Sequence, residues 1–249
     1  MSLAIDPHVS FVMPCYNEED SLGYTIPRLC RAFSEAGYRL ELVACDNGSR
    51  DKTGEIIARF RAEGLPIVPT RVEVNQGYGH GILHALKLTT GKWIGIVPAD
   101  GQVDAEDVVR LYESCRNSGR PVVGKVHRRF RLDGTNRAVV TAAYNAFVHL
   151  LWPGISSFDI NGSPKIVHRE VLEKLELKSK DWLLDPELMI KAHLLGVPVL
   201  EMNVFSRMRE SGTSHVTPMT AFEFFKRLVD YKFGAEMSDW QRARGIGSG

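Results

Sequence analysis

Acidic, amide and glycine residues gather in four short clusters within the first 102 residues of this 249-residue chain. The clusters read PCYNEED at 14–20, DNGSRDKT at 46–53, NQGYGHG at 75–81 and PADGQ at 98–102. Carboxylate oxygens accept hydrogen bonds from N–H and hydroxyl groups, and carboxylate and amide oxygens also bind hard divalent cations. One such cluster alone would indicate a turn, but four exceed what turn chemistry requires. We therefore expect them to furnish a ligand-binding site.

Each cluster directly follows a short apolar segment that is typical of a buried strand. These segments lie at 9–13, 40–45, 67–74 and 93–97, and predicted helices at about 21–36, 51–63 and 79–89 separate them. Strands that alternate with helices across short turns predict a parallel sheet built from βαβ units. Because ligands bind outside the carboxyl ends of such strands, the four clusters should meet at one edge of the sheet.

The clusters resemble, in order, the motifs of the family 2 inverting glycosyltransferases. PCYNEED resembles the family's P-x-Y-N-E, CDNGSRDKT its V-D-D-G-S-x-D-x-T, and residues 75–102 its N-x-G-x-G…A…G-strand-D-x-D stretch. The closest similarity within the family is to polyprenyl-phosphate transferases of the dolichyl-phosphate mannose synthase type. The resemblance implies an α/β glycosyltransferase A fold with a single Rossmann-like, mostly parallel twisted sheet flanked by helices. It also implies a nucleotide diphosphate sugar donor and Mg²⁺ or Mn²⁺ as cofactor.

We expect one glycosyltransferase domain over 1–240, divided into a nucleotide-sugar-binding half at 8–115 and an acceptor-binding half at 116–240. The second half is less regular in sequence. Its expected elements are a strand at 120–126, helices at 135–152 and 185–195, an edge strand at 197–205 and a terminal helix at 218–233. The tail at 241–249 ends in glycine and serine, and we expect it to be disordered.

The resemblance assigns a set of residues to the donor pocket: Pro14, Tyr16, Glu18, Asp46, Gly48, Asn75, Gly77, Asp100, Arg209 and Ser214. Among these, Asp46 would accept hydrogen bonds from the base or ribose, and Gly48 would allow close approach. The alternative for Asp46 is that it caps the next helix, and Asp51 and Thr53 are predicted as first-turn residues of that helix.

The metal motif departs from the family pattern. Where the family has D-x-D-x-Q, this chain has Pro98, Asp100 and Gln102. One carboxylate, one amide oxygen and two diphosphate oxygens could still hold Mg²⁺ or Mn²⁺. Since one charge is missing, we expect weak metal binding in the absence of donor.

Two other kinds of site are disfavoured. His80 and His84 have the i, i+4 spacing of a zinc pair but lack the glutamate of H-E-x-x-H. The glycines of NQGYGHG lack the G-x-G-x-x-G spacing of a dinucleotide site, so we interpret them as allowing close packing and phosphate approach.

A basic run precedes an apolar stretch in the second half. Arginines stand at 120, 128, 129, 131 and 137, and residues 138–152 are mostly apolar. Arginine forks suit phosphates, and a basic segment beside an apolar helix suits a lipid phosphate. By resemblance, Arg128 and Arg131 meet the acceptor phosphate. The alternative is a solvated basic loop before a buried core helix.

Further residues match family motifs near the acceptor and the leaving group. The segment FDINGSP with Lys165 matches the acceptor-side D-x-x-[SG]-G motif, which adds Asn161 and Lys165 to the acceptor site. Arg209 and Ser214 match R-x-x-G-x-S, whose arginine meets the donor diphosphate. The alternative for Arg209 is a surface arginine in a loop.

Asp185 and Glu187 lie near the start of a predicted helix, where carboxylates are favoured electrostatically. Family members that glycosylate hydroxyls carry their catalytic base in an acidic pair near this point. A hydroxyl acceptor needs a base, whereas a phosphate is already ionised near neutral pH. These two carboxylates are therefore essential only if the acceptor is a hydroxyl.

Composition restricts the remaining possibilities. The net charge of +1 does not favour nucleic acid as a partner, and the four cysteines have no metal-ligand spacing, which favours reduced, buried thiols. The N-terminus has no signal-peptide pattern. The mostly apolar stretch at 138–152 has 15 residues and contains Asn145 and His149, so it is shorter than the about 20 apolar residues that a membrane span needs. We expect a cytoplasmic protein that makes peripheral contact with the cytoplasmic membrane face. The terminal helix, with Phe222, Phe224, Phe225 and Leu228, offers either a docking face or a core-packing face.

The sequence thus predicts a metal-dependent inverting glycosyltransferase with a polyprenyl phosphate acceptor, in which Asp100, Arg209, Asp185 and Glu187 are the catalytic candidates. Two alternatives stay open. One is a soluble enzyme that glycosylates a hydroxyl of a small molecule or glycan. The other is a degenerate protein that binds a nucleotide sugar without transferring it.

Overall fold

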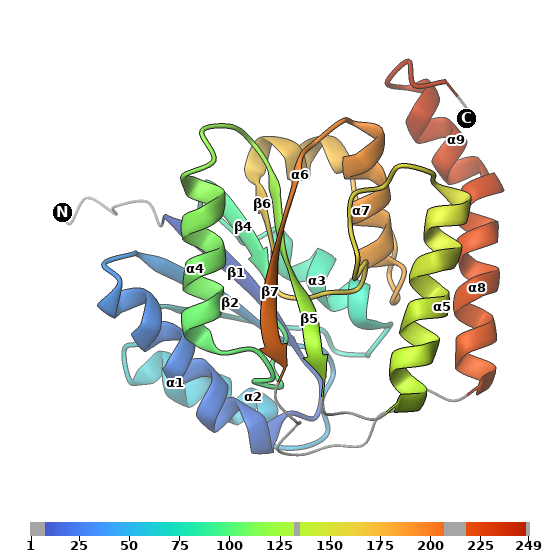
Figure 1. Ribbon diagram of the computed structural model, residues 1–249. Helices are drawn as coiled ribbons and strands as arrows, with labels where there is room; N and C mark the ends of the chain where they lie inside the picture. The colour runs from blue at the N-terminus through green and yellow to red at the C-terminus, as the bar shows by residue number, and fades with distance from the viewer. Residues whose placement is uncertain (1–7, 132–134, 207–217, 248–249) are drawn as a thin grey trace.

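The computed structural model describes residues 8–131, 135–206 and 218–247. Within these ranges the chain forms one seven-stranded sheet in the order β3-β2-β1-β4-β6-β5-β7 (Figure 1). The strands are β1 Val9–Cys15, β2 Leu40–Asp46, β3 Ile67–Arg71, β4 Trp93–Ile96, β5 Val123–Arg131, β6 Lys165–His168 and β7 Val199–Ser206. All neighbours are parallel except β6, which runs antiparallel to both β4 and β5. The predicted α/β class with a mostly parallel sheet is confirmed.

Helices cover both faces of this sheet (Figure 1). They are α1 Glu19–Glu35, α2 Thr53–Ala62, α3 Tyr78–Leu86, α4 Ala105–Arg116, α5 Thr135–Leu151, α6 Arg169–Leu175, α7 Leu184–Leu194, α8 Pro218–Phe233 and α9 Ala235–Arg242. Side chains of α1, α2 and α4 form one core with the sheet, and those of α3 and α5 to α9 form the core on the other face.

The central strand β1 explains why its sequence is apolar without interruption. Phe11 and Met13 belong to the first core and Val12 to the second, and all three are fully buried. Successive side chains of a strand point to opposite faces, so a strand that is covered on both faces must be apolar at nearly every position.

Strand direction decides which loops lie together. The carboxyl ends of β1 to β4, β5 and β7 all reach the same edge of the sheet, and β6 enters from that edge because it runs the other way. The four polar clusters and residues 159–165, which lead into β6, therefore share one edge.

The second half differs from expectation in three places. The strand predicted at 120–126 extends to Arg131, because β5 pairs with β7 as far as Arg131 and Ser206, so the basic residues 128–131 lie in a strand. The short strand β6 was not predicted. The disordered tail expected from residue 241 is wrong for 241–247, since α9 ends at Arg242 and Ile246 packs against the second core.

The apolar stretch of α5 and the aromatic residues of α8 meet each other. Tyr144 and Phe147 of α5 contact Phe225 of α8, and Leu228 is fully buried. The core-packing alternative for α8 is thus confirmed for these side chains. No helix in the described parts of the chain has the length and apolar character needed to cross a bilayer. All four cysteines are free and buried, as predicted.

Gly23 of α1 and Gly79 of α3 are helical glycines that give a matched test of the packing around α3. A Cβ atom at Gly79 would overlap the carbonyl oxygen of Ser179, whereas a Cβ atom at Gly23 would meet open space. We expect Gly79→Ala to lower the free energy of unfolding by about 1–3 kcal/mol through overpacking. Gly23→Ala should raise it by up to about 1 kcal/mol, because alanine favours a helix. Urea titration measures both, and equal effects would contradict the close approach at Gly79.

Candidate active site

Asp46 ends β2 at the shared edge and is 4% exposed. Its Oδ1 atom accepts a hydrogen bond from the Ser49 backbone N–H at 2.9 Å, and its Oδ2 atom lies 3.8 Å from an Arg71 guanidinium nitrogen. The carboxylate thus closes the turn that follows the strand and does not cap α2, which begins at Thr53. Its contact with a base or ribose stays a prediction.

The clusters that follow β2 and β3 lie in close contact and are hydrogen-bonded to each other. Gly48 has a φ of +78°, and a Cβ atom there would lie 2.7 Å from the Asn75 backbone nitrogen. The Asn47 side chain donates to the Gly77 carbonyl oxygen at 3.0 Å, and the Asn75 side-chain oxygen accepts the Gly77 N–H at 2.8 Å. Gly48, Asn75 and Gly77, all predicted on the donor side, are therefore brought together.

The cluster after β1 is connected to the start of α2 by hydrogen bonds. Tyr16 is 45% exposed, and Pro14 is half-buried within β1. The Glu18 N–H donates to the Thr53 hydroxyl at 2.8 Å, and Asp51 accepts hydrogen bonds from the N–H groups of Glu19 and Thr53. Thr53 is the first residue of α2, as predicted, whereas Asp51 lies two residues before the helix and accepts its first N–H.

The candidate metal ligands Asp100 and Gln102 lie in the loop after β4, and both are half-buried. An Asp100 carboxylate oxygen accepts the Gln102 N–H at 3.2 Å across Gly101, whose φ is +63°. In the described residues, no group of three or more His, Cys, Asp or Glu side chains could hold a metal. Two oxygen ligands on one loop fit a hard cation that takes its other ligands from a diphosphate and water.

The two histidines of α3 do not form a metal pair in this structure. His84 Nε2 lies 2.9 Å from the Thr70 hydroxyl. Burial and the positive charge of Lys180 lower the pKa of His80. The zinc interpretation, already disfavoured by the sequence, gains no support.

Tyr78 is the first residue of α3, and its ring stacks on Trp182, which lies just before α7. Burial raises the pKa of its hydroxyl well above the usual range, and the carboxylates of Asp185 and Asp100 raise it further. The charge of Arg128 acts in the opposite direction. Tyr78 was not among the predicted site residues, although its place between two closely packed glycines marked it as a residue held against a neighbouring segment.

Two fully buried lysines stand on the acceptor side, each with a carboxylate. Lys165 starts β6, and its ammonium group lies 2.5 Å from Asp185 of α7. Lys125 of β5 lies 2.7 Å from Glu201 of β7. Burial and the nearby charge of Lys165 lower the pKa of Lys125 to about 8, against the effect of Glu201. Lys125 and Glu201 were not predicted, because the two partners lie 76 residues apart in the sequence.

Arg128 is held by Asp159. Its Nε and Nη2 atoms donate to the two carboxylate oxygens at 2.9 and 3.0 Å, and the arginine side chain is 16% exposed. Burial alone would raise the pKa of Asp159, but the charge and hydrogen bonds of Arg128 outweigh it and lower the pKa to about 2. The fork that we expected to bind an acceptor phosphate is thus engaged by a carboxylate in this structure.

The remaining predicted acceptor residues have different outcomes. The side chain of Asn161 lies near the Tyr144 hydroxyl and lowers its pKa, against the larger effect of burial. Arg131 is the last residue of β5, and its side chain lies outside the described residues, as do Arg209 and Ser214.

Glu187 is the main correction to the predicted site. Its side chain is fully buried, 2.6 Å from the Lys191 ammonium group, and it accepts N–H groups of Lys178 and Ser179 at 2.8–3.1 Å. A carboxylate whose oxygens are bound to the protein on all these sides cannot reach an acceptor. The predicted acidic pair therefore divides into Asp185, near the site, and Glu187, a structural residue.

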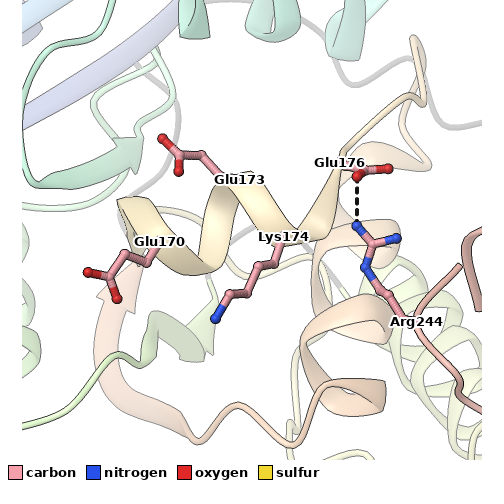
Figure 2. A pocket seen from close by; sticks show the side chains of 5 residues that line it. All are labelled: Glu170, Glu173, Lys174, Glu176 and Arg244. Atoms are coloured by element: carbon pink, nitrogen blue, oxygen red, sulfur yellow. Dashed lines mark ion pairs between the residues drawn. The ribbon is translucent and has the colours of Figure 1, made fainter.

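A surface pocket of about 500 Å³ lies elsewhere (Figure 2). It is lined by Glu170, Glu173, Lys174, Glu176 and Arg244, and Glu176 pairs with Arg244 at 2.8 Å. Helix α6 follows the end of β6, which pairs with the start of β4, so this pocket lies at the opposite edge of the sheet. It is not part of the candidate site.

Comparison with known proteins gives a consistent result. The family model for Glycosyl transferase family 2 matches residues 10–176. An undecaprenyl-phosphate 4-deoxy-4-formamido-L-arabinose transferase of Pseudomonas aeruginosa is 30% identical over 168 residues, which is 67% of this chain and 49% of the relative. The transferase of the same name from Klebsiella pneumoniae is 32% identical over 56% of this chain and 42% of its own. The chain spans about half the length of these curated relatives.

Solved structures resemble the chain over most of its length. Glucosyl-3-phosphoglycerate synthase from Mycobacterium tuberculosis, in complex with Mn²⁺, UDP-glucose and phosphoglyceric acid, has a TM-score of 0.70 at 19% identity, covering 90% of this chain and 77% of its own. S. aureus TarS 1-349 in complex with UDP-GlcNAc has a TM-score of 0.60 at 17% identity, covering 94% and 69%. These likenesses confirm the glycosyltransferase A fold.

The Arg128–Asp159 pair should set the acid stability of the protein. Asp159→Asn leaves a largely buried guanidinium without its counterion, so we expect the free energy of unfolding at pH 7 to fall by about 3 kcal/mol. The lowered pKa of Asp159 contributes stability that is complete above its ordinary value of 3.8 and is lost as pH falls through about 2. That contribution is about 2 kcal/mol in the native protein and should vanish from the variant's profile.

Urea titrations between pH 2 and pH 7 measure both effects. Asp230→Asn is the matched control, because it breaks the exposed pair with Lys226 at 2.9 Å. An exposed pair contributes at most about 1 kcal/mol. If both substitutions had equal effects at pH 7, the buried pair would not have the importance given to it here.

Proposed function

Because the chain belongs to glycosyl transferase family 2, we propose that it transfers a sugar from a nucleotide diphosphate sugar to a polyprenyl phosphate, with inversion at the anomeric carbon. The observation that carries the choice of acceptor is the buried pair between Lys165 and Asp185. The names of the two curated relatives, which are undecaprenyl-phosphate transferases, support the same class of acceptor.

The pairing of Asp185 with Lys165 argues against a hydroxyl acceptor. A hydroxyl must lose its proton to a base during attack, and Asp185 is the candidate base that remains after Glu187 is set aside. Protonation of Asp185 would leave the fully buried ammonium group of Lys165 without its counterion, which is costly. A phosphate monoester is already ionised near neutral pH and needs no base.

The donor would lie across the clusters that follow β1 to β4. Asp100 and Gln102 would hold Mg²⁺ or Mn²⁺ together with the diphosphate oxygens, and the cation would neutralise the charge on that group. Arg209, by its resemblance to the family's R-x-x-G-x-S motif, would serve the same diphosphate.

The acceptor phosphate would approach from the side of β5 and β6. Strand β5 brings Arg128 and Arg131 to the shared edge, and β6 begins there with Lys165. In the reaction, a phosphate oxygen of the acceptor attacks the anomeric carbon and forms the new C–O bond. The bond between that carbon and the donor's diphosphate breaks, and the nucleoside diphosphate leaves with the electron pair. No proton has to move.

Calorimetric titration with GDP and UDP, each with and without Mn²⁺, tests the donor site. We expect one nucleotide to bind in a metal-dependent manner, because the chain alone supplies too few ligands for the cation. Asp100→Ala should weaken this binding by at least tenfold, about 1.4 kcal/mol. Asp104→Ala removes a carboxylate four residues further on, which makes no side-chain cap for α4, and should leave binding unchanged. If neither nucleotide bound with Mn²⁺, the proposed function would fail.

A second assay compares undecaprenyl phosphate with undecaprenol in the same detergent. The two lipids differ only in the phosphate, so one offers an ionised oxygen and the other a hydroxyl. We expect radiolabelled sugar to become butanol-extractable with the phosphate and not with the alcohol. Equal transfer to both lipids, or transfer only to water-soluble hydroxyl acceptors, would contradict the argument from Asp185. Donor binding without any transfer would favour the degenerate alternative.

A further inference from the structure

Trp182 is an exposed aromatic residue at the edge of the candidate site. Its side chain is 58% exposed although one ring face stacks on Tyr78, with ring centroids 4.8 Å apart and planes 11° apart. The other three tryptophans, Trp93, Trp152 and Trp240, are at most 7% exposed. Isolated exposed aromatic residues are common on protein surfaces, so exposure by itself indicates nothing.

The backbone that carries Trp182 is fixed on two sides. Glu187 of α7 binds the N–H groups of Lys178 and Ser179, and Lys180 O accepts the His80 N–H of α3 at 2.8 Å. A Cβ atom at Gly77 would lie 2.5 Å from that same carbonyl oxygen. The glycines of the NQGYGHG cluster therefore serve to seat this segment against the start of α3.

The far side of the segment is fixed as well. Asp181 accepts the Leu183 N–H at 2.9 Å and pairs with Arg227 of α8. A fully buried carboxylate, two closely packed glycines and an ion pair thus hold the six residues 178–183 in place. The large apolar side chain that this segment exposes, beside its exposed lysines, is that of Trp182.

The position of Tyr78 shows where the indole lies in the site. Tyr78 directly follows Gly77, whose carbonyl oxygen accepts the Asn47 side chain, and Trp182 lies three residues before Asp185, which pairs with Lys165. The carboxylates of Asp185 and Asp100 both act on the Tyr78 hydroxyl and raise its pKa. On the proposed function, on which this inference rests, Asp100 marks the diphosphate and Asp185 with Lys165 marks the acceptor. The transferred sugar must lie between the two groups, which is the region that the Tyr78–Trp182 stack borders.

We propose that Trp182 forms a wall of a sugar-binding subsite, with the indole packing against the apolar C–H face of the donor's sugar ring. A flat aromatic ring gives a large contact area at little cost in conformational entropy, and here the ring is already held by Tyr78. The nucleobase is assigned by the motifs to the clusters after β1 and β2, so the indole is expected to contact the sugar and not the base.

Binding of a nucleotide sugar and of its nucleoside diphosphate, both with Mn²⁺, separates the two parts of the donor. UDP-glucose against UDP and GDP-mannose against GDP are the probes. We expect Trp182→Ala to raise the Kd of the nucleotide sugar about tenfold, which corresponds to about 1.4 kcal/mol. The Kd of the nucleoside diphosphate should not change, and Trp182→Phe should restore most of the affinity. Phe233→Ala, at an exposed aromatic residue that ends α8, is the control and should change neither.

Tryptophan fluorescence gives an independent measurement. Because the other three tryptophans are buried, the emission that acrylamide quenches comes mainly from Trp182. A nucleotide sugar should protect this emission from acrylamide, and the nucleoside diphosphate should not.

The outcomes distinguish this inference from the proposed function. If wild-type protein binds a nucleotide sugar and Trp182→Ala binds it equally well, the sugar subsite is wrong and the donor assignment stands. If the variant loses affinity equally for the nucleotide sugar and the nucleoside diphosphate, Trp182 does not contact the sugar specifically, and the inference is again overturned. If the wild type binds no nucleotide, the proposed function and the inference fall together.

Discussion

Charge burial is the constraint on which the second half of this structure depends. Lys125 and Lys165 are fully buried and Arg128 is largely so, and each has a carboxylate within 3.0 Å from a different part of the chain. An unpaired charge at such a position would cost several kcal/mol, so each pair must form if the chain is to fold in this way. The pairs connect β5 to β7, β5 to the loop before β6, and β6 to α7.

The carboxylates also organise backbone that has no regular structure. Glu201 accepts the N–H groups of Phe158 and Asp159 as well as the Lys125 ammonium group. Glu187 does the same for residues 178 and 179. In both cases a side chain from a regular element supplies the hydrogen bonds that a loop cannot supply to itself, and the loop in turn brings functional candidates to the edge of the sheet.

The sequence alone was sufficient to predict the strands and helices of the first half of the fold, and the reason is physical. Strands β1, β2 and β4 are buried on both faces, and β3 begins with the buried Ile67. Amphipathic helices separate these strands, so a local pattern identifies them. Strand β6 has four residues and begins with Lys165, which is buried only because Asp185, 20 residues later, neutralises it. The partners Lys125 and Glu201 are 76 residues apart, and no local pattern reveals such a pair. Family motifs placed most of the candidate residues at one edge of the sheet, but they could not tell that Glu187 is enclosed by Lys191 and by the backbone of residues 178 and 179.

The pairing of Lys165 with Asp185 also limits how this protein can change over time. Neither residue can be replaced alone without leaving a buried charge, so neutral drift at one position is blocked until the other has changed. A lineage can leave this state through a nearly simultaneous double substitution, for example to two apolar residues of similar volume, which buried ion pairs tolerate well. That exchange would remove the charges beside the proposed acceptor site in a single step. Change of acceptor chemistry in this lineage is therefore expected to be abrupt and not gradual.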